Sequence, residues 1–266
     1  MKILHSNIVG SGDNHFIILH GFLGMGDNWK THAKKLAEKG YCVHLVDQRN
    51  HGRSFWSNKF DYEVMVNDLH HYLNHHGIEQ GNVLGHSMGG KTAMSFALQY
   101  PDRVQKLIIA DIAPKYYVPH HQKILAGLST LNFGEIKSRN AAAEHLENYI
   151  PDAVTRQFLL KNLYWVSEGH LGLRTNIAVL KNAAEAIGAA LQSQKQYHQP
   201  TLFLYGENSN YINPKTDIEI LQYFPKAEIV EIKGAGHWLH AEQPLLFFKI
   251  LTDWLTPLPH DSNRVG

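Results

Sequence analysis

The sequence predicts an α/β protein, with a mostly parallel central sheet, helices on both faces and a helical lid insertion. Three observations favour this fold class. Short apolar segments, typical of strands buried on both faces of a sheet, alternate with helical patterns. The 266 residues suffice for one large α/β core. One long stretch, residues 115–198, interrupts the alternation.

Six segments are predicted to be strands because they are mostly apolar and rich in β-branched residues. They are "FIIL" (16–19), "CVHLV" (42–46), "NVLG" (82–85), "LIIA" (107–110), "TLFLY" (201–205) and "EIVEI" (228–232). Helices are predicted over 28–40, 63–77, 89–101 and roughly 244–255. The first two end at Gly40 and Gly77, as helix C-termini often do, and the third ends before Pro101.

The stretch 115–198 shows no convincing strand pattern. Helical patterns are seen in "AAAEHLENYI" (141–150), "DAVTRQFLLKNLYWV" (152–166) and "IAVLKNAAEAIGAALQSQ" (177–194). We expect this insertion to form a helical lid over the C-terminal edge of the sheet. The expected core then comprises residues 1–114 and 199–258, followed by a flexible tail at 259–266.

Composition excludes several classes of protein. The chain is 44% hydrophobic and 18% charged, with a net charge of +1, so we expect neither a disordered chain nor a nucleic-acid-binding protein. No apolar run is long enough for a membrane span. The N-terminus lacks a signal-peptide pattern, and the single cysteine, Cys42, cannot form an intramolecular disulfide. These features favour a cytoplasmic protein in which Cys42 is a buried structural thiol.

A serine nucleophile is predicted in "VLGHSMGGKTAM". The segment Gly85-His86-Ser87-Met88-Gly89 matches G-x-S-x-G between a predicted strand and a predicted helix. Such a sharp turn needs glycines two residues on either side, and it presents the serine hydroxyl at the positive end of the helix. The alternative is a glycine-rich turn with an idle serine.

A general base is predicted in "GAGHWLHAEQP", after the last predicted strand. His237 lies there in a glycine-flanked loop, from which an imidazole could accept the proton of the serine hydroxyl. Its position singles it out, because the chain contains 19 histidines. The neighbouring His240 is interpreted as part of the loop structure.

An oxyanion hole is predicted in "HGFLGMGDNW", which follows the "FIIL" strand. The backbone N–H groups of Phe22 and Met88 would point at the negative charge that develops on an attacked carbonyl oxygen. The alternative for His20-Gly21 is an ordinary turn at the end of a strand.

Four segments together make the chain resemble an α/β-hydrolase over essentially its whole length, and more narrowly the YbfF-type small esterases. This bacterial group is related to a mitochondrial hydrolase. The segments are "HGFLGMGDNW", "DQRNHGRS" (47–54), "GHSMGGKTAM" (85–94) and "GAGHWLHAEQP" (234–244). In "DQRNHGRS", we expect Asp47 and Arg49 to make buried polar contacts around the end of a strand.

The catalytic acid is not at its usual place in this fold. After the strand in "LFLYGENSNYI" that place holds Ser209. The resemblance implies that the acid instead follows the preceding strand, which runs into Asp111, while Ser209 becomes a hydrogen-bonding neighbour of His237 or Asp111. The alternative acid is Glu207, which lies only one residue past Gly206.

Other candidate residues are weaker. The pairs His70-His71, His75-His76 and His120-His121 invite a metal site, but the first two lie on a helix beside polar residues and are interpreted as its solvated face. Most aromatic residues of the insertion are expected to pack the lid. For the substrate pocket we select Tyr116, Trp165 and Trp238.

These residues predict a serine hydrolase that cleaves carboxylic esters or thioesters through an acyl-enzyme on Ser87. The substrate is expected to be a small molecule with a short to medium acyl chain, and no cofactor or metal is required. Two alternatives stay open: a lyase or carbon–carbon hydrolase with the same triad, and a hydrolase-fold ligand receptor. The oligomeric state is not predicted.

Overall fold

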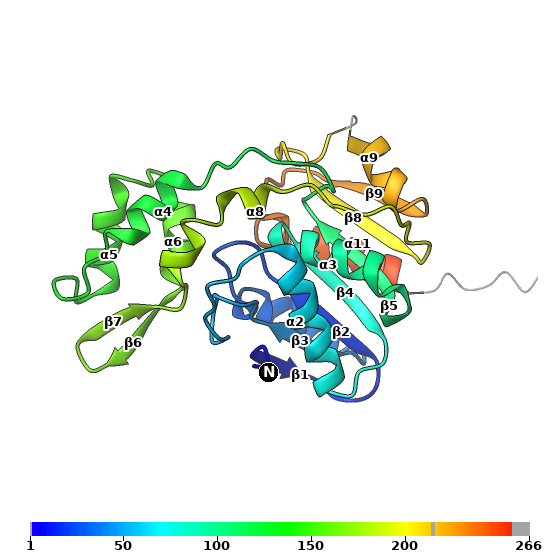
Figure 1. Cartoon of the computed structure of the whole chain (residues 1–266), viewed down its shortest axis with the longest axis horizontal. Helices are drawn as coiled ribbons and strands as arrows, with labels where there is room; N and C mark the ends of the chain where they lie inside the picture. The colour runs from blue at the N-terminus through cyan, green and yellow to red at the C-terminus, as the bar shows by residue number, and fades with distance from the viewer. Residues whose placement is uncertain (1, 214–215, 257–266) are drawn as a thin grey trace, which may run out of the picture.

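The computed structural model describes residues 2–213 and 216–256, and within them seven strands form one sheet (Figure 1). The strand order is β1-β3-β2-β4-β5-β8-β9. The strands are β1 (Ser6–Val9), β2 (His15–Leu19), β3 (Cys42–Val46), β4 (Gly81–His86), β5 (Val104–Ala110), β8 (Thr201–Gly206) and β9 (Ala227–Ile232). All neighbouring pairs are parallel except β1 and β3. The predicted fold class is confirmed, and β1 is a strand that the sequence analysis missed.

Helices cover both faces of the sheet because its strands are apolar on both faces. Along β2, Ile17 packs into an apolar cluster that holds side chains of α2 and α3, whereas Ile18 packs into one that holds side chains of α1 and α11. These helices are α1 (Lys30–Ala37), preceded by the short helix η1 (Gly26–Trp29), α2 (Tyr62–His75), α3 (Met88–Gln99) and α11 (Pro244–Leu255). The short helices α9 (Thr216–Tyr223) and α10 (Leu239–Glu242) were not predicted. No helix in the described ranges is long and apolar enough to cross a membrane.

Between β5 and β8 the chain forms a separate group of elements, gathered to one side of the sheet in Figure 1. They are α4 (Gln122–Ser129), α5 (Arg139–Glu147), α6 (Ala153–Leu160), β6 (Leu163–Ser167), β7 (His170–Leu173), α7 (Ile177–Leu180) and α8 (Ala184–Gly188). The expectation of an insertion without strands is therefore wrong, since β6 and β7 pair as an antiparallel hairpin. The helix expected over 152–166 ends at Leu160, and the β-prone segment "LYWVS" continues as a strand. The helix expected over 177–194 is reduced to the short α7 and α8.

A buried lysine ties both ends of this insertion to the core. Lys91, on α3, donates hydrogen bonds from Nζ to the carbonyl oxygens of Lys115 (2.7 Å), Gly188 (3.1 Å) and Ala189. Burial lowers the pKa of the Lys91 ammonium to about 7. The Tyr62 hydroxyl adds a hydrogen bond of 2.7 Å to the carbonyl oxygen of Ile187. The chain therefore leaves and re-enters the core at one fixed place.

The loop after β3 makes the buried polar contacts that were predicted for Asp47 and Arg49. The Asp47 carboxylate accepts hydrogen bonds from the amides of Gly26 (2.7 Å) and Arg53 (2.9 Å). The Arg49 guanidinium forms a two-pronged ion pair with Asp68, at 2.5 and 2.8 Å. This prediction is confirmed. Residues 257–258 of the expected core and the expected tail, 259–266, lie outside the described residues.

Candidate active site

The loops after the six parallel strands begin at one edge of the sheet, and Ser87 lies in the sharp turn after β4. Ser87 joins β4 to α3 with φ 53° and ψ −117°, a strained conformation for any residue with a side chain. The two flanking positions, Gly85 and Gly89, leave no room for a Cβ atom. A Cβ on Gly85 would lie 2.2 Å from the carbonyl oxygen of Gly89, and one on Gly89 would lie 2.3 Å from that of Leu19. The G-x-S-x-G spacing is thus explained by backbone contact on both sides of the serine.

The structure brings His237 and Asp111 to Ser87. The Nε2 atom of His237 lies 3.1 Å from the Ser87 hydroxyl oxygen, and its Nδ1 lies 2.7 Å from Oδ2 of Asp111. Because an ionised carboxylate only accepts hydrogen bonds, Nδ1 is the donor and the lone pair of Nε2 faces the serine. Asp111 is fully buried, and it also accepts hydrogen bonds from the Ser209 hydroxyl (2.5 Å) and the Gly206 amide (3.2 Å). Ser209 therefore contacts the carboxylate, one of its two expected partners.

Glu207, the alternative acid, points elsewhere. Its carboxylate accepts hydrogen bonds from the Gly234 amide (2.8 Å) and the Lys233 ammonium (3.1 Å), and its side chain is exposed. These two donors lower the pKa of the Glu207 carboxyl. The end of β5 lies beside the end of β8 in the sheet, so Asp111 reaches the position that a residue after β8 usually occupies.

The turn after β2 carries the predicted oxyanion donor, Phe22. His20 anchors this turn: its Nδ1 lies 2.8 Å from the carbonyl oxygen of Gly21, and its Nε2 accepts a hydrogen bond from the Gln48 amide. Burial lowers the pKa of the His20 imidazole to about 4, so it stays neutral. Phe22 and Met88 both line cavities that reach Ser87. Within the described residues, the Phe22 amide donates no backbone hydrogen bond.

Two cavities meet at Ser87. The larger one, of about 250 Å³, has a mostly apolar lining that includes Phe22, Phe158 and Trp238. The smaller one, of about 30 Å³, lies toward Met88. His120, His121 and Tyr211 line both cavities, as Ser87 does.

The three aromatic residues selected for the pocket have different positions. Trp238 lines the larger cavity, where its ring lies 5.3 Å from that of Phe158. Tyr116 is exposed and bonds to Glu185 of α8. Trp165 is exposed on β6, in the hairpin. Tyr116 and Trp165 thus lie on the surface of the insertion, and neither lines one of the two cavities beside Ser87.

Sequence reasoning missed two residues that touch this site. The ring of Tyr211 stacks on the His237 imidazole, with centroids 4.0 Å apart and planes 15° apart. The ring of His121 packs edge-on against Phe22, and burial lowers the pKa of His121 to about 3. The sequence analysis considered the His120-His121 pair only as a possible metal site. Its position at the start of the insertion was the one signal in the sequence that could have indicated contact with the cavity.

The other histidines near the site are structural. His240 is buried and stacks on Trp29, with ring centroids 3.9 Å apart, so it packs the structure as expected, but it lies in the short helix α10 and not in a loop. His86 lies 2.9 Å from the carbonyl oxygen of His237 through its Nε2 atom. Away from the site, His70 of α2 stacks on Tyr100, the residue that follows α3.

A serine on a sharp strand-to-helix turn, hydrogen-bonded to a histidine and through it to a buried carboxylate at adjacent strand ends, defines the α/β-hydrolase class. Comparison with known proteins places the chain in that class. The family model described as alpha/beta hydrolase fold matches residues 14–244. The chain therefore belongs to the alpha/beta hydrolase fold family.

Individual relatives resemble the chain over most of its length. It is 37% identical to a mouse protein named sn-1-specific diacylglycerol lipase ABHD11, over 90% of this chain and 80% of that protein. It is 33% identical to the protein named Esterase YbfF of Escherichia coli K12, over 86% and 87% of the two chains. A solved structure titled "Marine microorganism esterase" superposes with a TM-score of 0.92 at 40% identity, covering 96% of this chain and all of that one. The predicted resemblance to YbfF-type esterases is confirmed.

Proposed function

We propose that this chain is a serine ester hydrolase of the carboxylesterase type, acting on carboxylic esters and thioesters with short to medium acyl chains. The observation that carries the proposal is the hydrogen-bonded series from Ser87 through His237 to Asp111, at 3.1 and 2.7 Å, with two cavities beside the serine. The names of the relatives, which include esterases and lipases, support the same reaction class.

The geometry leads to a two-step reaction. Ser87 Oγ attacks the acyl carbon while its proton passes to Nε2 of His237, and the carbonyl oxygen becomes an oxyanion held by the N–H groups of Phe22 and Met88. The C–O or C–S bond to the leaving group then breaks, and the leaving alkoxide or thiolate takes the proton from His237. Water repeats the sequence on the acyl-enzyme and releases the acid and free Ser87.

The larger cavity is the place we assign to the acyl chain. Its apolar walls suit a hydrocarbon chain, and Trp238 and Phe158 restrict its length. Residues 115–198, which contribute Phe158, act in this proposal as a lid on a core formed by 1–114 and 199–258. The name of the mouse relative makes diacylglycerol a substrate that must also be tested.

Labelling and turnover test the proposal separately. A fluorophosphonate should add one label to the intact protein and none to Ser87→Ala. On p-nitrophenyl and coenzyme A esters of graded length, we expect kcat/KM to be higher for butyryl than for palmitoyl groups. Higher kcat/KM on palmitoyl esters or diacylglycerol would contradict the chain-length assignment, and an unlabelled wild-type protein would contradict the nucleophile. Product analysis identifies a lyase or carbon–carbon cleavage, and a labelled protein without turnover would favour a receptor.

A further inference from the structure

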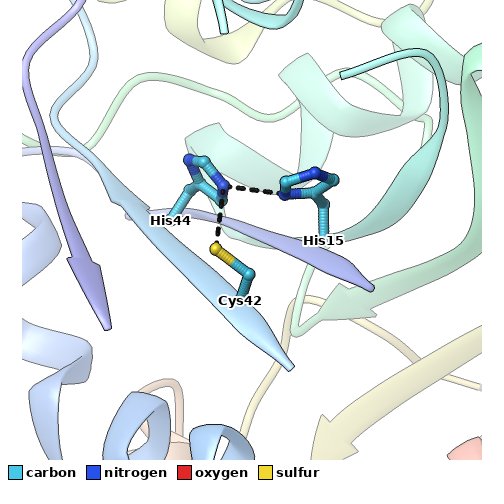
Figure 2. A group of neighbouring side chains, drawn as sticks. All are labelled: His15, Cys42 and His44. Atoms are coloured by element: carbon cyan, nitrogen blue, oxygen red, sulfur yellow. Dashed lines mark hydrogen bonds between the residues drawn. The ribbon is translucent and has the colours of Figure 1, made fainter. Parts of the chain in front are cut away.

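We propose that His15, Cys42 and His44 form a zinc-binding site at the N-terminal edge of the sheet, opposite the edge that carries Ser87 (Figure 2). His15 and Cys42 are the first residues of the neighbouring parallel strands β2 and β3, and they are partners in the strand register. His44 follows Cys42 by two positions and so shares its face of the sheet. Three side chains with metal-ligating atoms are thereby fixed by regular strand pairing.

The spacing of the three ligand atoms fits a tetrahedral zinc ion. Nδ1 of His15 lies 3.1 Å from Nε2 of His44, and Sγ of Cys42 lies 3.7 Å from the same nitrogen. With Zn–N distances of about 2.0–2.1 Å and a Zn–S distance of about 2.3 Å, tetrahedral geometry separates two nitrogens by about 3.3 Å and a nitrogen from a sulfur by about 3.6 Å. All three atoms lie within 4.8 Å of one another, so the third pair, Nδ1 of His15 and Sγ of Cys42, needs to close by about 1.2 Å at most.

The contacts of His44 fit a tautomer in which Nε2 carries the lone pair. The Tyr72 hydroxyl donates to Ser6 Oγ at 2.7 Å, and the same Tyr72 oxygen lies 2.7 Å from Nδ1 of His44. The zinc site requires the His44 tautomer that carries its hydrogen on Nδ1 and donates it to the Tyr72 oxygen, while the Tyr72 hydroxyl shares a hydrogen bond with Ser6. The lone pair of Nε2 then points at His15 and Cys42 (Figure 2). Hydrogen-bonded partners of this kind orient metal-ligating histidines.

His15 and Cys42 both lie within reach of one nitrogen of His44. The single lone pair of Nε2 cannot accept a good hydrogen bond from both the His15 ring and the Cys42 thiol, yet both atoms are directed at it. A cation replaces this competition with three ligand bonds. One thiolate and two imidazoles favour zinc over calcium or magnesium, which prefer oxygen ligands.

The surroundings allow the ion to enter and complete its shell. His15 is only half-buried, whereas Cys42 and His44 are buried, so the open side lies toward His15. The exposed His76, just past α2, has its ring 5.7 Å from that of His44. Burial, and then the negative charge of Asp13, raise the pKa of the free Cys42 thiol, so a bound cation has to displace its proton. Water is assigned the fourth position. Because the ligands come from two strands that meet only in the folded chain, zinc should stabilise the fold.

Metal titration of the untagged full chain, stripped with a chelator, tests the site. Co²⁺ is the optical probe, since a Cys42 thiolate bound to tetrahedral Co²⁺ gives a charge-transfer band and visible d–d bands. We expect one equivalent of Co²⁺ to produce these bands, Zn²⁺ to displace it, and Zn²⁺ to raise Tm. In Cys42→Ser the charge-transfer band should vanish, and in His15→Gln the zinc affinity should fall by more than about 100-fold.

The matched control is His75→Gln, which removes an exposed histidine at the end of α2 and leaves the three ligands intact. It should bind Co²⁺ and Zn²⁺ as the wild type does. If Cys42→Ser does not fold, His15→Gln decides the outcome, because its side chain is half-exposed. The proposal is overturned if the wild type gives no thiolate band, if both site variants bind Zn²⁺ as the wild type does, or if the chain takes up Cu²⁺ but not Zn²⁺.

Discussion

The two edges of the sheet each hold a histidine whose Nδ1 is fixed by a hydrogen bond and whose Nε2 faces other reactive groups. At the C-terminal edge the partner of His237 is the carboxylate of Asp111, at 2.7 Å. At the N-terminal edge the partner of His44 is the hydroxyl of Tyr72, also at 2.7 Å. A buried carboxylate stabilises an imidazolium, whereas a neutral phenol does not. Burial lowers the pKa of His44 to about 4, so His44 stays neutral and His237 is the one equipped to take a proton.

The edges also differ in how the chain builds them. Ser87 and Asp111 have φ values of 53° and 52°, and Leu23 and Asn50, in the loops after β2 and β3, have 58° and 64°, so within the described residues the C-terminal edge holds four non-glycine residues with positive φ. His15, Cys42 and His44 lie on regular strand positions. Strained turns aim individual side chains at one point, whereas strand register only places neighbours side by side. The first arrangement suits reaction with a substrate, and the second suits holding an ion.

The largest expected effect comes from Asp111→Asn, which replaces the charged partner of His237 with a neutral one. The C-terminal edge then resembles the N-terminal edge, where the partner of His44 is the neutral hydroxyl of Tyr72. We expect kcat/KM on a butyryl ester to fall by ~10⁴, because an amide favours the wrong imidazole tautomer and does not stabilise the imidazolium. The fold should persist, as circular dichroism can check. Glu207→Gln is the control and should retain nearly full activity, since Glu207 bonds to Lys233 and Gly234. Near-normal activity in Asp111→Asn would disprove the assigned acid.

Ser209 tests whether the second partner of the acid contributes. Ser209→Ala removes a hydrogen bond to the Asp111 carboxylate, worth about 1.5 kcal/mol for a charged acceptor, so kcat/KM should fall on the order of 10-fold. The double variant Asp111→Asn with Ser209→Asp moves the carboxylate from the end of β5 to the loop after β8. It should recover part of the activity lost in Asp111→Asn, measured on the same ester. No recovery in a folded double variant would show that the two positions do not serve one imidazole.

Much of the C-terminal edge could be predicted from sequence because its chemistry depends on short local patterns. Apolar runs identified six strands, and the glycines beside Ser87 and His237 marked the loops after two of them. The choice of Asp111 needed the resemblance to a family, since nothing local separates it from other residues that follow a strand. Tyr211 was not found, because stacking on His237 depends on the path of an irregular loop.

The N-terminal edge could not be predicted because it depends on register. Cys42 and His44 share one face of a strand by simple alternation, but His15 is 27 positions away from Cys42 in the chain and joins them only through the pairing of β2 with β3. The hairpin in the insertion was missed for a different reason. The apolar pattern of α6 runs directly into β6, so the helical period masks the start of the strand.

A further difference between histidines appears as a pH dependence of stability. Burial places the pKa of His240 well below its usual value, so between pH 6.5 and that pKa the unfolded chain binds a proton that the folded chain does not. The free energy of unfolding therefore falls as the pH drops, by at most about 1.4 kcal/mol per pH unit for one such histidine. His240→Phe keeps the stacking on Trp29 and removes a buried Nδ1 that has no partner within the described residues.

We expect the unfolding free energy of His240→Phe to depend less on pH than that of the wild type. Urea unfolding at pH 6.5 and 5.5 measures the difference. The unfolding free energy of the variant minus that of the wild type should be larger at pH 5.5 than at pH 6.5. An equal pH slope in both proteins would show that His240 is not held neutral in the folded state.

The smallest expected effect concerns the tyrosine at each edge. Tyr72 meets His44 edge-on, with planes 86° apart, and acts through its hydroxyl. Tyr211 instead lies flat on His237, with planes 15° apart, while its own hydroxyl forms a hydrogen bond of 2.7 Å with His120.

When His237 takes the serine proton, the Tyr211 ring faces a cation, an interaction worth about 1 kcal/mol. Tyr211→Leu should therefore lower kcat about fivefold with little change in KM, and Tyr211→Phe should restore most of the loss because it keeps the ring. If Tyr211→Phe loses as much kcat as Tyr211→Leu in steady-state kinetics on a butyryl ester, the hydroxyl and not the ring face matters, and the contrast with Tyr72 fails.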